Sequence, residues 1–259
     1  MIDIINAKNE FNNYVSNYDP TNSRIKLKQE HILRVAEICK NIAIDLNLSE
    51  EEIKVAELIG IFHDLGRFEQ VKLFNKYNDK VCGIDHADFS NKVLFENDFI
   101  RKFITDNNYD EIIKKAVFNH NKLHIEPGLS EKELLFAKII RDADKLDIIY
   151  TSTCYEFKDV FWYEDFNIEK INEQIVENFA QTKLLEYKYV KTNADQCMCF
   201  FSYIYDLYFE YSMKYLKNTK LLEIFVKRIK DIFKSPIIHT QIDRVLVIAN
   251  NYLDSHITN

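Results

Sequence analysis

Apolar residues recur through most of the chain with the 3.6-residue spacing of amphipathic α-helices. Between residues 22 and 46, for example, Val35, Cys39 and Ile42 fall on one helix face, and His31 shares that face. Only four glycines and three prolines interrupt the 259 residues, so few turns separate such stretches. The pattern predicts an all-α fold, a compact bundle of many helices with additional C-terminal helices.

Capping signals and breakers predict where the helices begin and end. A serine followed three residues later by a glutamate predicts capping boxes at Ser49 and Ser130, and Asn108 with Glu111 resembles another. The helix after Ser49 is expected to stop at Gly66. The remaining helices are expected at about residues 2–14, 22–46, 85–96, 168–190, 195–216, 219–234 and 238–254.

No internal repeat, low-complexity linker or clean boundary divides the chain. We therefore expect one all-helical domain over residues 1–259. The residues with candidate chemistry end before residue 150, which predicts a functional core at 22–150. Supporting helices at 151–259 would line one side of the site or form the interface of a homodimer.

Charge and cysteine content narrow the class of protein. The net charge of −7 argues against general binding of nucleic acid or an anionic membrane, since phosphate groups require a basic face. Apolar runs are far shorter than the roughly 20 residues that span a bilayer. Five cysteines, an odd number without a zinc-type pair, and no secretory signal predict a cytoplasmic protein with reduced thiols.

The strongest chemical signal is the adjacent pair His63-Asp64, within Ile-Phe-His-Asp-Leu-Gly-Arg. Imidazole nitrogens and carboxylate oxygens are ligands for divalent metal ions. Neighbouring residues diverge by about 100° on a helix, but at a helix end both can turn toward one ion. An isolated pair would more often be a buried histidine beside a capping aspartate.

Further candidate ligands accompany the pair. Asp142 and Asp144 point about 200° apart on a helix, so they cannot easily share one ion. Asp144 lies on an inward apolar stripe and is the predicted ligand, whereas Asp142 is expected in a solvated environment among lysines. Three other histidines stand on otherwise apolar helix faces, and the core of a helical bundle can combine such residues into a metal site. They are His31, His86 and His120.

The order His31, His63-Asp64 and Asp144 resembles the HD superfamily of metal-dependent phosphohydrolases. The resemblance covers roughly residues 28–150, and it rests on the flanking sequences His-Asp-Leu-Gly-Arg and Asp-Ala-Asp-Lys-Leu-Asp. It implies that these four residues hold a divalent ion (Fe, Mn, Zn, Mg, Co or Ni). Two histidines that some branches add correspond to His86 and His120, which implies a second ion. Residues 22–150 would then be an HD metal-binding core.

The resemblance also implies an activity, the hydrolysis of a phosphate ester by a metal-activated hydroxide. The substrate would be a nucleotide or another small phosphorylated molecule. Because charge builds on the phosphoryl oxygens, cations should line the pocket. Arg67 and Lys145 are the predicted catalytic and substrate-binding cations, Lys122 is a third substrate-binding candidate, and Asp64 is expected to act in catalysis as well as in metal binding.

Two other hypotheses about the function stay open. Some six-ligand members of the superfamily are di-iron oxygenases, and His86 with His120 would allow that chemistry here. A non-catalytic regulatory HD protein is the other alternative, although the ligand set is intact. The absence of a Gly-Tyr-Pro motif and of a synthetase half disfavours the cyclic-dinucleotide and alarmone branches.

Overall fold

The structure is a computed structural model that describes residues 2–96, 98–161 and 165–258. In this part of the chain the elements are helical, apart from an isolated antiparallel bridge between Ile2 and Ile104. The predicted all-α fold is confirmed. The chain divides into two compact units, residues 1–144 and 145–259, and the boundary lies inside α8 (Glu131–Cys154).

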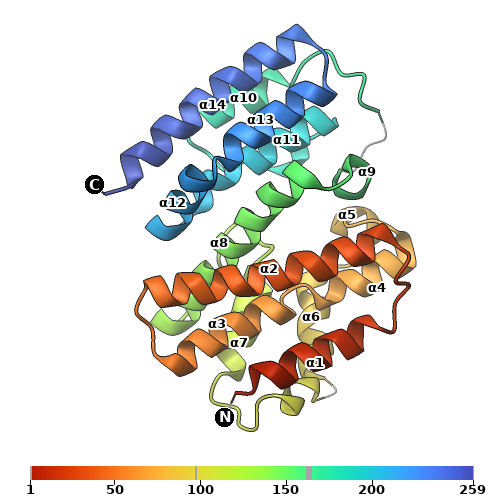
Figure 1. The fold of residues 1–259 in the computed structure, drawn as a ribbon, viewed down its shortest axis with the longest axis vertical. Helices are drawn as coiled ribbons and strands as arrows, with labels where there is room; N and C mark the ends of the chain where they lie inside the picture. The colour runs from red at the N-terminus through yellow and green to blue at the C-terminus, as the bar shows by residue number, and fades with distance from the viewer. Residues whose placement is uncertain (1, 97, 162–164, 259) are drawn as a thin grey trace. The chain divides into compact units, whose positions relative to one another are not determined.

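The first unit contains the predicted functional core as far as Asp144 (Figure 1). Its helices before α8 are α1 (Ile4–Val15), α2 (Ser23–Asp45), α3 (Glu50–Phe62), α4 (Leu65–Phe74), α5 (Asp79–Cys82), α6 (His86–Phe95), the 3-10 helix η1 (Phe99–Lys102) and α7 (Asp110–Asn119). The long helix α2 packs along α3, α4 packs on α6, and α6 packs on α7. These contacts bring together the helices that carry the candidate ligands.

The second unit is built from shorter helices around an aromatic core. They are α9 (Phe157–Val160), α10 (Glu173–Ala180), η2 (Tyr187–Tyr189), α11 (Asn193–Ser202), η3 (Tyr203–Asp206), α12 (Glu210–Thr219), α13 (Leu221–Ile232) and α14 (Pro236–His256). The long helix α14 packs on α10, α12 and α13. The rings of Phe201 and Phe225 stack 5.1 Å apart between α11 and α13. A single domain over 1–259 stays a prediction, as does a supporting role for this unit.

Two of the three predicted capping boxes are confirmed. At Ser49 and at Ser130 the serine and the glutamate three residues later bond reciprocally. The box at Asn108 is wrong, because α7 follows Tyr109 without a side-chain cap. In the second unit, the expected helices at 168–190 and 195–216 are each interrupted, since 3-10 turns and extended residues intervene.

The expected helix end at Gly66 is also wrong, and the difference matters for the site. Helix α3 ends at Phe62, and α4 begins at Leu65. Gly66 instead lies where α4 meets α6, because a Cβ there would come within 2.4 Å of the His86 carbonyl oxygen. Its amide donates to Ser90 Oγ at 2.8 Å. His63 and Asp64 therefore occupy the break between two helices.

No helix within the described residues has both the length and the apolar character needed to cross a membrane. The cytoplasmic location stays a prediction.

The close approach of α2 and α3 yields a stability prediction. A Cβ at Gly60 would lie 2.5 Å from Ala36 Cα, a backbone atom that cannot move without separating the helices. We expect Gly60→Ala to lower the free energy of unfolding by about 1–3 kcal/mol, as overpacking does. Urea unfolding measures the change. Lys54→Ala, on the exposed face of α3, is the control, and equal stability of the two variants would contradict the prediction.

Candidate metal centre

The first group of candidate ligands combines residues from α2, from α8 and from the break between α3 and α4. Nε2 of His31 on α2 lies 3.1 Å from Oδ1 of Asp144 on α8, and Nε2 of His63 lies 3.6 Å from the same oxygen. Both nitrogens lie 3.7 Å from Oδ2 of Asp64. All four side chains are buried. The four residues that the HD resemblance assigned to one metal therefore converge.

A second group shares Asp64 with the first. Oδ1 of Asp64 lies 3.3 Å from Nε2 of His86 and 3.5 Å from Nε2 of His120. The two histidine nitrogens are 2.9 Å apart. Thus the two oxygens of one carboxylate face different histidine groups, as they would in a bridge between two ions.

The break between α3 and α4 explains how adjacent residues can both face the centre. His63 still has helical backbone angles, φ −58° and ψ −34°, whereas Asp64 departs to φ −113° and ψ 21°. The chain turns at Asp64, so the usual divergence of about 100° between neighbours on a helix does not apply. This departure, rather than a glycine stop, lets both side chains of the His-Asp pair face the centre.

Three of the four candidate histidine rings are oriented by a bond to the nitrogen that faces away from the centre. Nδ1 of His63 donates to the Gly60 carbonyl at 2.8 Å, and Nδ1 of His120 donates to the Val117 carbonyl at 2.6 Å. Because a carbonyl can only accept, Nδ1 carries the proton and Nε2 keeps a lone pair that points into the centre. Partners of this kind are typical of metal-ligating histidines.

His86 has a charged partner instead of a carbonyl. Its Nδ1 lies 2.5 Å from Oδ2 of Asp79, in the arrangement of a carboxylate–histidine–metal triad. Gln70 and Arg67 donate to the other carboxylate oxygen of Asp79 at 2.9 Å and 2.7 Å. A third set of ligand-type atoms, from Asp79, Asp85 and His86, would use this same Nδ1. Since Asp79 already accepts a hydrogen bond from Nδ1 of His86, we assign these acids to holding the His86 ring in place.

The electrostatics keep the ligands in their metal-binding forms. Burial lowers the pKa of His63, and burial together with the nearby Arg67 charge lowers the pKa of His86 to about 4. Burial alone would raise the pKa of Asp64, but Lys28 and the surrounding histidines hold it well below its usual range. At neutral pH His63 and His86 are therefore neutral, and Asp64 and Asp144 are ionised.

Two buried atoms fit the metal directly. Nε2 of His63 and Oδ1 of Asp64 are sealed from solvent and have no hydrogen-bond partner among the described residues. Leaving a buried polar atom unpaired is costly, and a cation held by each histidine group would satisfy the unpaired atom on its own side of Asp64. The nitrogen and oxygen donor set suits Zn, Fe, Mn, Co or Ni. The residues present therefore fit one or two divalent ions.

Comparison with known families agrees with this geometry. A family model described as the HD domain matches residues 29–149, which include the six candidate ligands. This part of the chain is an HD domain. The recognition of the HD superfamily from the sequence is confirmed, and the metal-dependent hydrolase class is the one the domain indicates. No curated protein and no solved structure matches the chain significantly.

Outside its ligands, the HD domain places two of the predicted cations against acids. Arg67 donates to Asp79 and to the Tyr77 carbonyl, and its Nε lies 3.6 Å from Asp64 Oδ1. Lys122 pairs with Asp85 beyond the second histidine group. The substrate-binding roles of both cations stay predictions.

Lys145 and Asp142 lie on either side of Asp144 along α8. Lys145 belongs to the second unit, where its Nζ lies 2.8 Å from Asp206 Oδ2, and its catalytic role stays a prediction. The solvated environment expected for Asp142 is wrong, because its side chain is fully buried. Its neighbours include the Cys39 thiol, whose pKa is raised chiefly by burial and further by the charges of Asp144 and Asp142.

Sequence reasoning missed two residues of the centre. Lys28 is buried, and its Nζ donates to Asp64 Oδ2 at 2.5 Å. Its position three residues before His31, on the same face of α2, was a usable signal. Asp79 had no such signal, because it lies outside the long helical periods and reaches His86 only through the folded chain.

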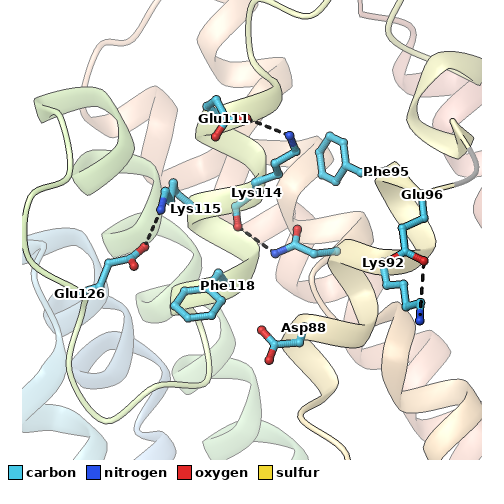
Figure 2. A pocket seen from close by; sticks show the side chains of 10 residues that line it. Asp88, Lys92, Phe95, Glu96, Glu111, Lys114, Lys115, Phe118 and Glu126 are labelled. Carbon is cyan, nitrogen blue, oxygen red and sulfur yellow. Dashed lines mark hydrogen bonds and ion pairs between the residues drawn. The ribbon is translucent and has the colours of Figure 1, made fainter.

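The HD domain also carries a surface groove that is separate from the ligands. Figure 2 shows its lining side chains, most of which lie on α6 and α7. The groove has a volume of about 540 Å³. Its lysines are paired with its acids, as Lys115 is with Glu126 at 3.2 Å and Lys114 with Glu111 at 2.8 Å. None of the lining residues is a candidate ligand. The paired charges give the groove no surplus of positive or negative charge, and its lining contributes no candidate ligand to the metal centre.

The shared carboxylate gives the first prediction for this site. We expect Asp64→Ala to abolish tight binding of both ions, since each histidine group loses its only common ligand. Metal analysis of the purified protein measures the stoichiometry. The control is Asp142→Asn, which alters a buried acid on α8 outside the two groups and should retain metal in its folded fraction. An Asp64→Ala protein that keeps its metal would refute the shared-ligand assignment.

Asp79 gives a prediction that separates the two groups. Loss of a carboxylate behind a ligating histidine typically weakens metal binding about 10- to 100-fold. We expect Asp79→Ala to lower the affinity for the second equivalent of Mn²⁺ by this factor and to leave the affinity for the first nearly unchanged. Isothermal titration calorimetry measures the two affinities. Asp88→Ala, an exposed acid on α6, is the control. Equal weakening of both equivalents would contradict an assignment of Asp79 to the His86 group.

Proposed function

We propose that this protein is a metal-dependent hydrolase of phosphate esters with two divalent ions. The observation that carries the proposal is the division of the Asp64 oxygens between two histidine groups. When bound, such a metal pair supplies a nucleophile at neutral pH and neutralises charge on the attacking and leaving oxygens. One shared carboxylate suits ions that lie close together.

The residues of the chain prepare the centre for this chemistry. The carbonyls of Gly60 and Val117 and the carboxylate of Asp79 hold the three rings with Nε2 inward. Burial keeps the imidazoles of His63 and His86 neutral and excludes bulk water from the centre, so charges there interact more strongly than they would in water. Ionised Asp64 and Asp144 then balance part of the charge of the ions.

We further propose a small substrate, a nucleotide or another phosphorylated molecule. The overall charge of −7 gives a long nucleic acid no favourable surface, whereas a local cationic centre can still receive one phosphate group. A cytoplasmic location, an absence of membrane binding and a homodimer belong to the same proposal. Arg67, Lys122 and Lys145 are the proposed cations around the substrate.

The six-ligand arrangement also supports a second candidate, a di-iron oxygenase. His86 and His120 complete a second nitrogen and oxygen donor group, and such groups suit iron. A non-catalytic regulatory HD protein is the remaining alternative. The orphaned buried atoms of His63 and Asp64 favour an occupied centre, which disfavours a role without metal.

The proposed function predicts two metal equivalents per chain and hydrolysis without oxygen. Protein purified anaerobically is analysed for metal and assayed with p-nitrophenyl phosphate, bis-p-nitrophenyl phosphate and nucleotides. We expect phosphate release that continues under anaerobic conditions and disappears in His63→Ala. Turnover that requires O₂ and iron would favour the oxygenase. Two bound equivalents with no reaction in either assay would favour the regulatory alternative.

A further inference from the structure

Lys28 makes a closer contact with a candidate metal ligand, Asp64, than Arg67 does, whose Nε lies 3.6 Å from the other oxygen of that carboxylate. Its Nζ donates to Oδ2 of Asp64 at 2.5 Å, on the side of the carboxylate that faces His31 and His63. By contrast, Arg67 and Lys122 are neutralised mainly by Asp79 and Asp85, which lie outside the shared carboxylate. A charge at the Lys28 position therefore acts on the reaction centre itself.

The ammonium group of Lys28 retains donor capacity. It has three N–H groups, and the contacts of the described residues give it one acceptor, Asp64 Oδ2. The Tyr77 ring, with its centroid 5.2 Å from Nζ, holds the ammonium in place without accepting a conventional hydrogen bond. Two N–H groups can therefore bond to the oxygens of a ligand.

Exposure indicates how a ligand would meet this group. The side chains of Lys28 and Asp144 are 11% and 12% exposed, whereas those of His31 and His63 are 1% and 0% exposed. Of these four groups, the two charged ones lie nearer to solvent, and the imidazoles lie deeper. An anion that reaches the centre past this edge would meet the ammonium before it meets the histidines.

We infer that Lys28 is a phosphate-binding residue, the cation that receives an oxygen of the substrate's phosphoryl group beside the metal ions. The inference rests on the proposed function and deepens it, because it names the side chain that complements the metals. One N–H group stays with Asp64 and orients the ammonium, and the other two bond to phosphate. Such charge-assisted hydrogen bonds are among the strongest in proteins.

The sign of the charge separates this role from a structural one. An ammonium repels a divalent cation at the same carboxylate, so its removal should leave metal binding equal or stronger. If Lys28 instead served to hold Asp64 in position for the metal, its removal would weaken metal binding. Phosphate binding should respond in the opposite sense, because an anion loses an attractive partner.

The test uses the full chain and two probes, Mn²⁺ and then inorganic phosphate, both followed by isothermal titration calorimetry. Lys28→Met retains the apolar stem and removes the charge, and Lys28→Arg restores the charge. Lys26→Met, at a mostly exposed position on the same helix, is the matched control. Thermal unfolding verifies that each protein is folded, and Lys28→Gln replaces Lys28→Met if the methionine variant is not.

We expect Lys28→Met to bind Mn²⁺ at least as tightly as the parent chain and to bind phosphate about 10- to 100-fold more weakly in the Mn²⁺-loaded state. Lys28→Arg should recover most of the phosphate affinity, and Lys26→Met should match the parent. Unchanged phosphate affinity in Lys28→Met, weaker Mn²⁺ binding, or a parent chain that binds no phosphate would each overturn the inference.

The same titrations distinguish this inference from the proposed function. If phosphate binding depends on Lys28 but no phosphate ester is hydrolysed, the site is an anion receptor, so the inference stands and the proposed hydrolase fails. If esters are hydrolysed while phosphate binding is independent of Lys28, the hydrolase stands and the inference fails.

Discussion

The buried carboxylate of Asp64 is the group on which the rest of the centre depends. It is almost fully removed from solvent, and an isolated charge there would be strongly unfavourable. The fold compensates with the ammonium of Lys28 on one oxygen and with histidine nitrogens on both sides. A carboxylate so surrounded stays ionised, and an ionised carboxylate with two oxygens in different surroundings can serve two ions.

This carboxylate is placed by close packing at two glycines. Gly60 lets α2 approach α3, and its carbonyl orients the His63 ring. Gly66 lets α4 approach the backbone of His86. Because neither contact tolerates a Cβ, the break at Asp64 is held between two tight helix contacts. The geometry of the centre and the packing of the first unit are therefore determined by the same positions.

The two histidine groups have different supports. His31 and Asp144 lie within the long helices α2 and α8, whereas His86 begins α6 and His120 follows the end of α7. The second group also relies on Asp79, which is held in turn by Arg67 and Gln70. Helix interiors are more rigid than helix ends and loops. The first group is accordingly the more preorganised of the two.

The sequence by itself determined the helical fold and the set of candidate ligands. Helical periodicity is local, so the apolar faces that carry His31 and His120 can be read directly, and the HD resemblance added the set of six residues. Capping boxes at Ser49 and Ser130 were equally local. The sequence missed the start of α4 at Leu65, because Gly66 is used for close packing and not for ending a helix.

Only the tertiary structure decided how the ligands divide and which cations face them. The division of the Asp64 oxygens depends on where α6 and α7 approach the helix break, which no local pattern encodes. Lys28 and Asp79 acquire their roles from contacts 36 and 7 residues distant in sequence. The burial of Asp142 likewise follows from packing around α8. Periodicity gives the face of a helix, but the partner of that face is set by the whole fold.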